Sequence, residues 1–262
     1  MKHIRYLTAI LLLLPIGLWA EHFFVAVLKK GTEYSEQIMV SKSKLGHLEV
    51  PVKQAWREGY RITDILHSPR RWSVVLSKGT TIGKQLYMHR RIMREFQTEV
   101  NHLLRQGYEI VNVENGVGEW VAVFEKGSRF KETHMNVTRD LSDMKKRIQQ
   151  RKEMGFDIID IEAAEGYWVA LFAKATGYLT QRYATYENWE ALAPAIAARW
   201  KEGYRIVNLE YGANGWFFLY AKEKNPSEEL YIRRHDHNAF RSSVRKYWKA
   251  GYRITDLAEG RR

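Results

Sequence analysis

"GYRITDI" occupies residues 59–65, and "GYRITDL" occupies residues 251–257, five residues before the C-terminus. Between the two stretches, a glycine followed by Tyr or Phe recurs every 48 residues. The complete set is Gly59, Gly107, Gly155, Gly203 and Gly251. A Trp follows each of the first four glycines by 13 residues, at Trp72, Trp120, Trp168 and Trp216. A fixed spacing kept by several residue types indicates an internal structural repeat.

The N-terminal part of the chain enters the same register. "FVAVLKKG" (24–31) matches "WSVVLSKG" (72–79) at a distance of 48 residues. The first unit therefore lacks the "GYRITD" segment, and the C-terminal unit consists of that segment. A solenoid is expected to end in atypical polar capping repeats, whereas both ends here keep the repeat pattern. We therefore predict five 48-residue units closed into a ring, in which the last strand completes the first unit.

Each unit is predicted to contain three strands and a helix, which gives an α+β fold of strand–strand–strand–helix repeats. Residues 60–66 and 72–78 are rich in β-branched and aromatic side chains, and residues 84–90 alternate apolar and polar ones, as strands do. Phe96 and Val100 then follow helical spacing. The recurring glycine comes directly after each helix, where a left-handed C-cap is favoured.

Three residues predict where helices begin. Pro51 and Pro194 fall early in the helical pattern, so both are expected in a first turn, where the missing N–H is not needed. Asn238 precedes the last helical segment and is expected to be its N-cap.

The wording of the repeat resembles a known domain of unknown function. "WREGYRI" (56–62) and "WSVVLSKGT" (72–80) are similar to repeats in the C-terminal region of certain plant casein-kinase-I-type kinases and in bacterial proteins. The kinase motifs "HRD" and "DFG" are absent from this sequence. The resemblance implies an accessory or binding module and transfers no catalytic residues. The predicted ring is also similar in architecture to the five-fold α/β-propeller of the pentein superfamily, whose sequence motifs are not matched.

The first twenty residues have the pattern of a secretory signal peptide. Lys2 and Arg5 precede an apolar run that ends at the small residue Ala20. We expect cleavage after Ala20, a periplasmic or secreted location, and a single five-repeat domain over 21–262. The alternative is an uncleaved N-terminal anchor, although the run is near the short limit for a membrane span.

Composition narrows the function classes. The chain has no Cys, which excludes disulfides, thiolate nucleophiles and thiolate metal sites. Its net charge is +12, or +10 for residues 21–262 without Lys2 and Arg5. Such a charge favours an anionic polymer or an acidic protein surface as partner, and the alternative is that it only keeps the protein soluble. No cofactor is expected.

Two polar positions recur in every unit. Five residues after each glycine stands an acid or amide: Asp64, Asn112, Asp160, Asn208 and Asp256. At the end of each second strand stands a lysine: Lys30, Lys78, Lys126, Lys174 and Lys222. Ring closure would gather each set, the Asx residues near the hairpin turns and the lysines at the opposite end as an anion site. Alternatively, each Asx side chain caps its own turn and each Lys is a solvated strand end.

Residues that break the symmetry are further candidates. His89, Arg90, Arg91, Arg233 and Arg234 form basic corners at equivalent strand ends. Such corners could hold phosphate or carboxylate groups, or they are ordinary charged surface.

"RHDHN" (234–238) places His235 and His237 on one face of a strand, as a metal pair requires. Because only Asp236 supplies a nearby carboxylate, no metal site is predicted. We therefore expect a non-enzymatic binding module for an anionic polymer or acidic protein surface. A structural component of an envelope complex is the alternative. An enzyme using His89, or His235 with Asp236, is less favoured.

Overall fold

The chain repeats a pattern of strands and helices along its length in the computed structural model, which describes residues 22–213 and 215–261. These residues form fifteen strands, five α-helices and one 3-10 helix, arranged as five three-stranded antiparallel sheets. The α+β class is therefore confirmed. The predicted signal peptide, residues 1–20, lies outside the described residues. Among the described helices, none has the length and apolar character needed to cross a membrane.

The strands are β1 (His22–Lys30), β2 (Gln37–Lys42), β3 (Arg61–Ser68), β4 (Arg71–Ser77), β5 (Gln85–Arg90), β6 (Glu109–Gly116), β7 (Glu119–Glu125), β8 (Lys131–Thr138), β9 (Asp157–Ala164), β10 (Tyr167–Lys174), β11 (Tyr178–Tyr186), β12 (Arg205–Gly212), β13 (Gly215–Glu223), β14 (Glu229–Arg234) and β15 (Tyr252–Arg261). The helices are η1 (Leu45–Leu48), α1 (Glu49–Arg57), α2 (Met93–Arg105), α3 (Leu141–Glu153), α4 (Trp189–Lys201) and α5 (His237–Lys249).

The middle strand of every sheet is the one that carries the recurring Trp, or Phe24 at the equivalent position of β1. The strand orders are β2-β4-β3, β5-β7-β6, β8-β10-β9, β11-β13-β12 and β14-β1-β15. In the last of these, the N-terminal strand β1 lies between β14 and β15, with Phe24 opposite Glu259 and Lys30 opposite Tyr252. The prediction that the C-terminal strand pairs with the N-terminal segment is confirmed.

The recurring glycines end the helices as expected. Gly59 has a φ of +88°, which a residue with a Cβ rarely adopts. Its N–H donates to the carbonyl of Trp56 at 3.2 Å, and the next N–H, from Tyr60, donates to Ala55 at 2.9 Å. These two bonds satisfy carbonyls that the helix end leaves free.

Two predicted helix starts are wrong. Asp236, not Asn238, caps α5, because its carboxylate accepts the N–H of Ala239 at 2.8 Å. In α4, the Asn188 side chain caps the helix, which therefore begins before the proline pattern suggests. Pro194 consequently lies in the second turn and not in the first.

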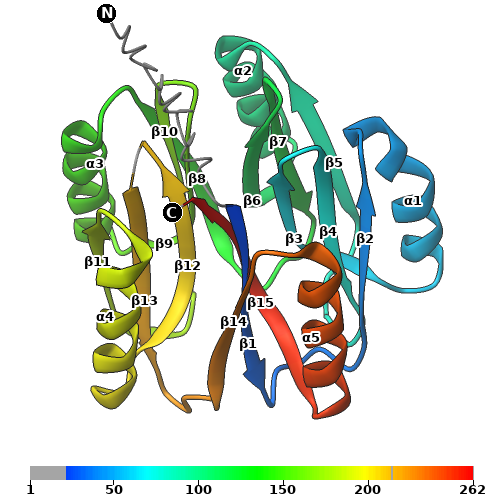
Figure 1. Cartoon of the computed structure of the whole chain (residues 1–262). Coiled ribbons are helices and arrows are strands. Elements are labelled where there is room, and N and C mark those ends of the chain that lie inside the picture. Colours follow the sequence, from blue (N-terminus) through cyan, green and yellow to red (C-terminus); the bar gives the residue numbers. More distant parts are fainter. Residues whose placement is uncertain (1–21, 214, 262) are drawn as a thin grey trace, which may run out of the picture.

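Each helix packs on its own sheet and on the middle strand of another sheet. Phe96 and Val100 of α2 belong to one hydrophobic core cluster with Trp120 of β7 and with Val169 and Leu171 of β10. The middle strands are consequently buried on both faces. The helices lie at the periphery and cover the sheets from outside (Figure 1). The recurring strand Trp residues are core side chains, as predicted.

The recurring Asx residue lies on the strand that comes third in each strand order above; these third strands are β3, β6, β9, β12 and β15. Each of them carries a bulge before its Asx residue. In β3, the pairing with β4 shifts between Ile62 and Asp64, so that Thr63 has no partner in the ladder. The five bulged residues are Thr63, Val111, Ile159, Val207 and Thr255. A bulge bends a strand and redirects its side chains.

A side chain from a neighbouring sheet bonds the backbone exposed at each bulge. Gln85 accepts the N–H of Ile62 at 2.7 Å and donates to its carbonyl at 2.8 Å. Gln37 makes the same pair of bonds to Ile254, across almost the whole chain length. Gln181 makes both bonds to Ile158, whereas Thr133 and Glu229 only accept the N–H of Ile110 and of Ile206. These clasps join consecutive sheets.

The third strands also contact one another. Strand β3 contacts β6 and β15, β9 contacts β6 and β12, and β12 contacts β15. Because these strands carry the recurring Asx residues, the contacts bring those side chains to one place.

Candidate functional site

Hydrogen bonds between side chains 48 positions apart join the recurring Asx residues in two groups, Asp64 with Asn112, and Asn208 with Asp160 and Asp256. Asn112 Nδ2 donates to Asp64 Oδ1 at 3.3 Å. Asn208 Nδ2 donates to Asp160 Oδ1 at 3.0 Å and to Asp256 Oδ1 at 3.2 Å. Amide donors therefore alternate with carboxylate acceptors in the order Asp, Asn, Asp, Asn, Asp. We call this set the Asx cluster.

The Asx side chains do not cap their own turns. Asp160 Oδ2 accepts the N–H of Val113 at 2.7 Å, and Asp256 Oδ2 accepts that of Leu209 at 3.0 Å, each from another sheet. Asp64 lies opposite Val75, in the middle of its hairpin. The expectation that these residues lie near the hairpin turns is wrong, because the third strand continues past the Asx position.

Burial shifts the ionisation of the cluster. It raises the pKa of Asp160 to about 7, although hydrogen bonds from the N–H groups of Val113 and Ile161 lower it. Burial also raises the pKa of Asp64 and of Asp256 well above the ordinary value. The Asp64 carboxylate raises the pKa of Asp256 further, because no amide separates these two neighbours.

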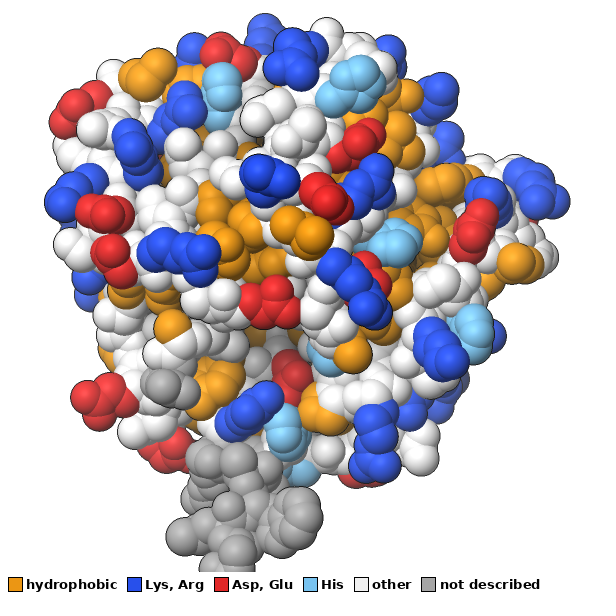
Figure 2. Space-filling model, turned by 90° about the horizontal axis from the view of Figure 1, so that it is seen from above, with side chains coloured by type: hydrophobic (Ala, Val, Ile, Leu, Met, Phe, Trp, Pro, Cys, Tyr) orange, Lys and Arg blue, Asp and Glu red, His pale blue; other side chains and the backbone are white. Residues whose placement is uncertain are grey.

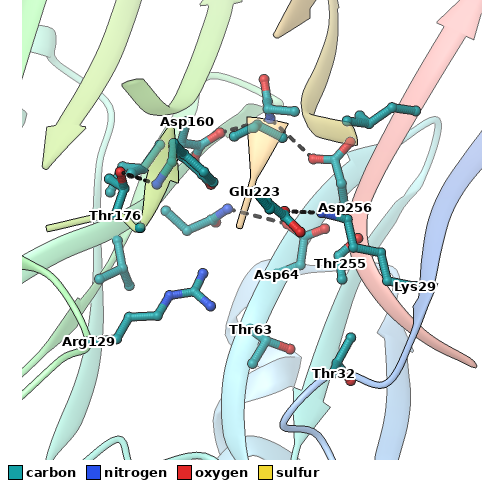
Figure 3. A pocket seen from close by; sticks show the side chains of 18 of the residues that line it. Lys29, Thr32, Thr63, Asp64, Arg129, Asp160, Thr176, Glu223, Thr255 and Asp256 are labelled. Carbon is teal, nitrogen blue, oxygen red and sulfur yellow. Dashed lines mark hydrogen bonds and ion pairs between the residues drawn. The ribbon is translucent and has the colours of Figure 1, made fainter. Parts of the chain in front are cut away.

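A cavity of about 390 Å³ has the Asx cluster as its floor (Figure 3). That volume is within the range of small-molecule sites. Bulged residues such as Thr63 and Thr255 and the loops after the middle strands supply the walls. Its lining includes Lys29, Thr32, Glu33, Tyr34, Thr63, Asp64, Asn112, Arg129, Asp160, Thr176, Tyr178, Asn208, Glu223, Thr255 and Asp256. We call it the central cavity.

Beside the Thr255 hydroxyl, which has no hydrogen-bond partner, three Asx oxygen atoms at this floor also lack one. They are Asp64 Oδ2, Asn112 Oδ1 and Asn208 Oδ1. Asp64 is 6% exposed and Asn208 is 8% exposed. A buried polar atom without a partner costs about 1–3 kcal/mol. An amide oxygen and an ionised carboxylate oxygen only accept, so a molecule that pairs these three atoms in that state donates hydrogen bonds.

The mouth of the cavity offers donors. The side chain of Arg129 is 58% exposed and has Glu33 Oε1 at 3.7 Å, an ion pair longer than a hydrogen bond. It points into the cavity in Figure 3. Burial raises the pKa of Tyr34, and it raises the pKa of Tyr178 to about 12, so both phenols remain protonated. The Arg129 guanidinium acts on both phenols in the opposite direction.

The second cation of the cavity is neutralised by carboxylates. Lys29 Nζ lies 2.7 Å from Glu223 Oε1 and 3.5 Å from Glu229 Oε2. Its side chain is 11% exposed. Lys29 therefore balances buried acids, and Arg129 is the cation with capacity for another anion.

A second cavity, of about 380 Å³, lies among the hairpin ends of the third strands. Glu114, Glu162, Glu210 and Glu259 line it. Burial and the neighbouring carboxylates raise the pKa of Glu114 and Glu162 well above the ordinary value, and that of Glu210 to about 8. On the face seen in Figure 2, acidic, basic and His side chains are interspersed. In the described part of the chain, no group of three or more His, Asp or Glu side chains is arranged to hold a metal ion.

The five recurring lysines lie apart from the central cavity, which none of them lines. Each lies over the aromatic ring that follows the recurring glycine of its unit. Lys78 Nζ is 4.4 Å from the Tyr60 centroid, and Lys126 Nζ is 4.6 Å from that of Tyr108. Lys30, Lys174 and Lys222 make the equivalent contacts. Lys78 also lies 3.3 Å from a Glu36 carboxylate oxygen. These are cation–π contacts at strand ends.

The first basic corner is paired with acids. Glu119 binds both His89 Nδ1 and Arg91 Nε, each at 2.9 Å. Arg90 lies 3.2 Å from Glu99. The local positive charge is therefore reduced, although Arg91 remains 76% exposed.

The second basic corner is partly covered by its own contacts. The Arg233 guanidinium stacks 3.9 Å from the Phe23 centroid, and Arg234 donates to the Arg233 carbonyl at 2.7 Å. Asp236, the carboxylate beside His235, is engaged as the α5 cap. The structure thus brings the Asx residues together but keeps the two basic corners on separate sheets.

The sequence interpretation missed Tyr34, Arg129 and Tyr178. These residues lie in or beside the loops that follow the middle strands, where the units differ from one another. At the position of Arg129, the flanking units carry Thr81 and Gly177. That loss of periodicity could have indicated Arg129, whereas Tyr34 and Tyr178 share one repeat position three units apart.

Comparison with protein-family models identifies a match over residues 81–261, to a domain of unknown function, DUF7477. No curated protein matches the chain. Because the match covers more than half of the sequence, the chain belongs to the DUF7477 family.

Proposed function

We propose that this DUF7477 member is a non-enzymatic binding module whose site is the central cavity. The observation that carries the proposal is the set of unpartnered, buried acceptors at the cavity floor. A folded protein rarely leaves such atoms unpaired. A bound molecule with hydrogen-bond donors would pair them. The accessory role implied by the resemblance to the C-terminal region of plant kinases agrees with a binding function.

The proposal includes a closed ring of five units, similar to an α/β-propeller. Two observations support closure. Strand β15 contacts both β12 and β3, so the chain of third-strand contacts returns to its start. Gln37 binds Ile254 as Gln85 binds Ile62, so the chain ends are joined by the same clasp as consecutive units. In such a ring the central cavity lies on the axis.

A thermal-shift screen of small polar metabolites tests the cavity. At least one compound should raise the melting temperature of the protein. A bulky residue at the mouth, Thr32→Trp, should abolish the shift, whereas Thr98→Trp on the exposed surface of α2 should leave it unchanged. No shift with any compound, or an equal shift in the Thr32→Trp variant, would rule out the cavity as the binding site.

An anionic polymer or an acidic protein surface is the second candidate ligand. The net charge of +12 and the exposure of Arg91 favour it. Retention on an acidic glycan is expected to persist at 150 mM salt, above the level of an unrelated protein of equal charge. Retention that falls with salt at the same rate for both proteins would exclude this candidate.

An exported location is also part of the proposal and rests on residues 1–20. The mass of the protein recovered from the producing cell should lack these twenty residues. An intact N-terminus would favour the uncleaved anchor.

A further inference from the structure

We propose that the central cavity binds a small zwitterion, with an ammonium group on the Asx cluster and a carboxylate at Arg129. The inference rests on the proposed function, since it names the ligand class of that same site. Four features support it: the free acceptors of the floor, the free donors of the mouth, their separation by neutral walls, and the engagement of Lys29.

The floor selects a donor-rich cation. Asp64 Oδ2, Asn112 Oδ1 and Asn208 Oδ1 have no partners and can only accept hydrogen bonds. A primary ammonium carries three N–H donors and no acceptor. Its charge would also favour the ionised form of Asp64 and Asp256, against the burial that raises the pKa of both. A neutral head group would supply no such charge, and an anionic one would raise those pKa values further.

The mouth selects an anion. Arg129 presents a planar fork of N–H donors that matches a carboxylate, and its Nη1 lies 3.7 Å from Oε1 of Glu33, which is itself 42% exposed. The phenols of Tyr34 and Tyr178 line the same cavity and add two O–H donors. A carboxylate between them would meet three donor side chains.

The walls between the two ends are short and neutral. Thr63 and Thr255 stand beside the floor, and both come from strand bulges. Lys29 does not compete for the anion, because Glu223 and Glu229 already bind it. The cavity therefore has a negative end and a positive end that are separately available, which a molecule with one charge of each sign satisfies.

Isothermal titration calorimetry with four kinds of probe tests the assignment. The probes are an ω-amino acid series from glycine to 6-aminohexanoate, the N-trimethylated analogue of the best member, a primary amine of equal length without the carboxylate, and the matching carboxylic acid without the amine. The variants are Arg129→Gln and Asp64→Asn, and Arg91→Gln serves as a surface-arginine control. Circular dichroism checks that each variant is folded.

One amino acid of the series should bind, and its trimethylated analogue, which has no N–H, should bind at least tenfold more weakly. Arg129→Gln should weaken the amino acid about tenfold or more and leave the simple amine unchanged. Asp64→Asn should weaken both. Arg91→Gln should change neither.

The failures are distinguishable. If no probe binds and the metabolite screen is also blank, the cavity is not a binding site and the proposed function fails. If the screen finds a ligand that the Thr32→Trp variant loses, but amine and amino acid bind equally and Arg129→Gln has no effect, the cavity stands and the zwitterion assignment is overturned. Binding of the trimethylated analogue as tightly as the primary amine would overturn the role of the floor acceptors.

Discussion

Replacing Gln37 by Leu should reveal how far the two chain ends hold the fold together. The Gln37 side chain bonds both the N–H and the carbonyl of Ile254, at 2.7 and 2.8 Å, and accepts the indole N–H of Trp248 at 3.0 Å. Leucine has a similar volume but forms none of these bonds. Two buried backbone groups would lose their partners, at about 1–3 kcal/mol each. We therefore expect the free energy of unfolding to fall by about 3 kcal/mol.

A second variant, Gln85→Leu, makes the comparison matched. Gln85 forms the same bonds to Ile62, and it accepts the indole N–H of Trp56 at 3.0 Å, but it joins segments 23 residues apart. Urea unfolding followed by far-ultraviolet circular dichroism measures both losses. They should be equal within about 1 kcal/mol.

Gln54→Leu is the control, because Gln54 bonds only the exposed Glu58 on α1. It should change stability by less than about 0.5 kcal/mol. A full loss for Gln85→Leu with none for Gln37→Leu would refute the idea that the ends take part in the same cooperative structure. No loss in either variant would refute the importance of the clasps.

Four further outcomes are expected. The pKa of Asp160 is about 7 in the folded protein against 3.8 ordinarily. Its contribution to the free energy of unfolding is therefore fully present below pH 4 and declines as the pH rises through 7, by up to about 4 kcal/mol. Denaturant unfolding should give a lower stability at pH 8 than at pH 5, and a flat profile would contradict the burial argument. Gly212→Ala should destabilise by at least about 1 kcal/mol in the same assay, because a Cβ there would stand 2.1 Å from the Ala163 carbonyl oxygen; unchanged stability would mean that the neighbouring strand yields. Lys126→Met removes only a cation–π contact over Tyr108 and should cost less than about 1 kcal/mol, so a larger loss would assign this lysine a further role. Deleting residues 251–262 removes the strand paired with β1 and should sharply lower the melting temperature, whereas an unchanged value would count against ring closure.

Periodicity predicted the repeated parts of the molecule well. The glycines that end the helices, the buried Trp residues and the pairing of β1 with β15 all follow from residue types that recur at one spacing. Each of these positions has the same physical duty in every unit, so the same residue or its equivalent is kept. The sequence also indicated which five Asx residues would gather in the cluster.

The place of that cluster was not foreseeable, because alternation of apolar and polar residues does not reveal a bulge. Strand β3 continues past Asp64 to Ser68, and after the shift at Thr63 the Asp64 carboxylate accepts the Asn112 amide of another sheet. The clasp residues were hidden for a related reason. Gln37, Gln85 and Gln181 read as ordinary strand starts until the exposed backbone that they bind is known.

The recurring lysines show the opposite limit. Their regular spacing suggested a common site, yet each lysine pairs with an aromatic ring of its own unit. Regular spacing shows that a contact is repeated, but it does not show that the repeated side chains meet. The loop residue Arg129, whose repeat position carries Thr81 and Gly177 in the flanking units, lines the cavity together with Tyr178.

The number of units has a consequence for the Asx cluster that follows from counting alone. Two residue types can alternate without conflict only around an even number of positions. In the proposed ring of five positions, one pair of like neighbours is unavoidable, and the pair is Asp256 and Asp64. The two aspartates lie on β15, in the sheet that the two chain ends share, and on β3 of the next sheet. The proposed ring of near-identical units therefore has one position that differs from the others. A molecule that enters the central cavity would meet a floor without rotational symmetry, and it could bind in a single orientation.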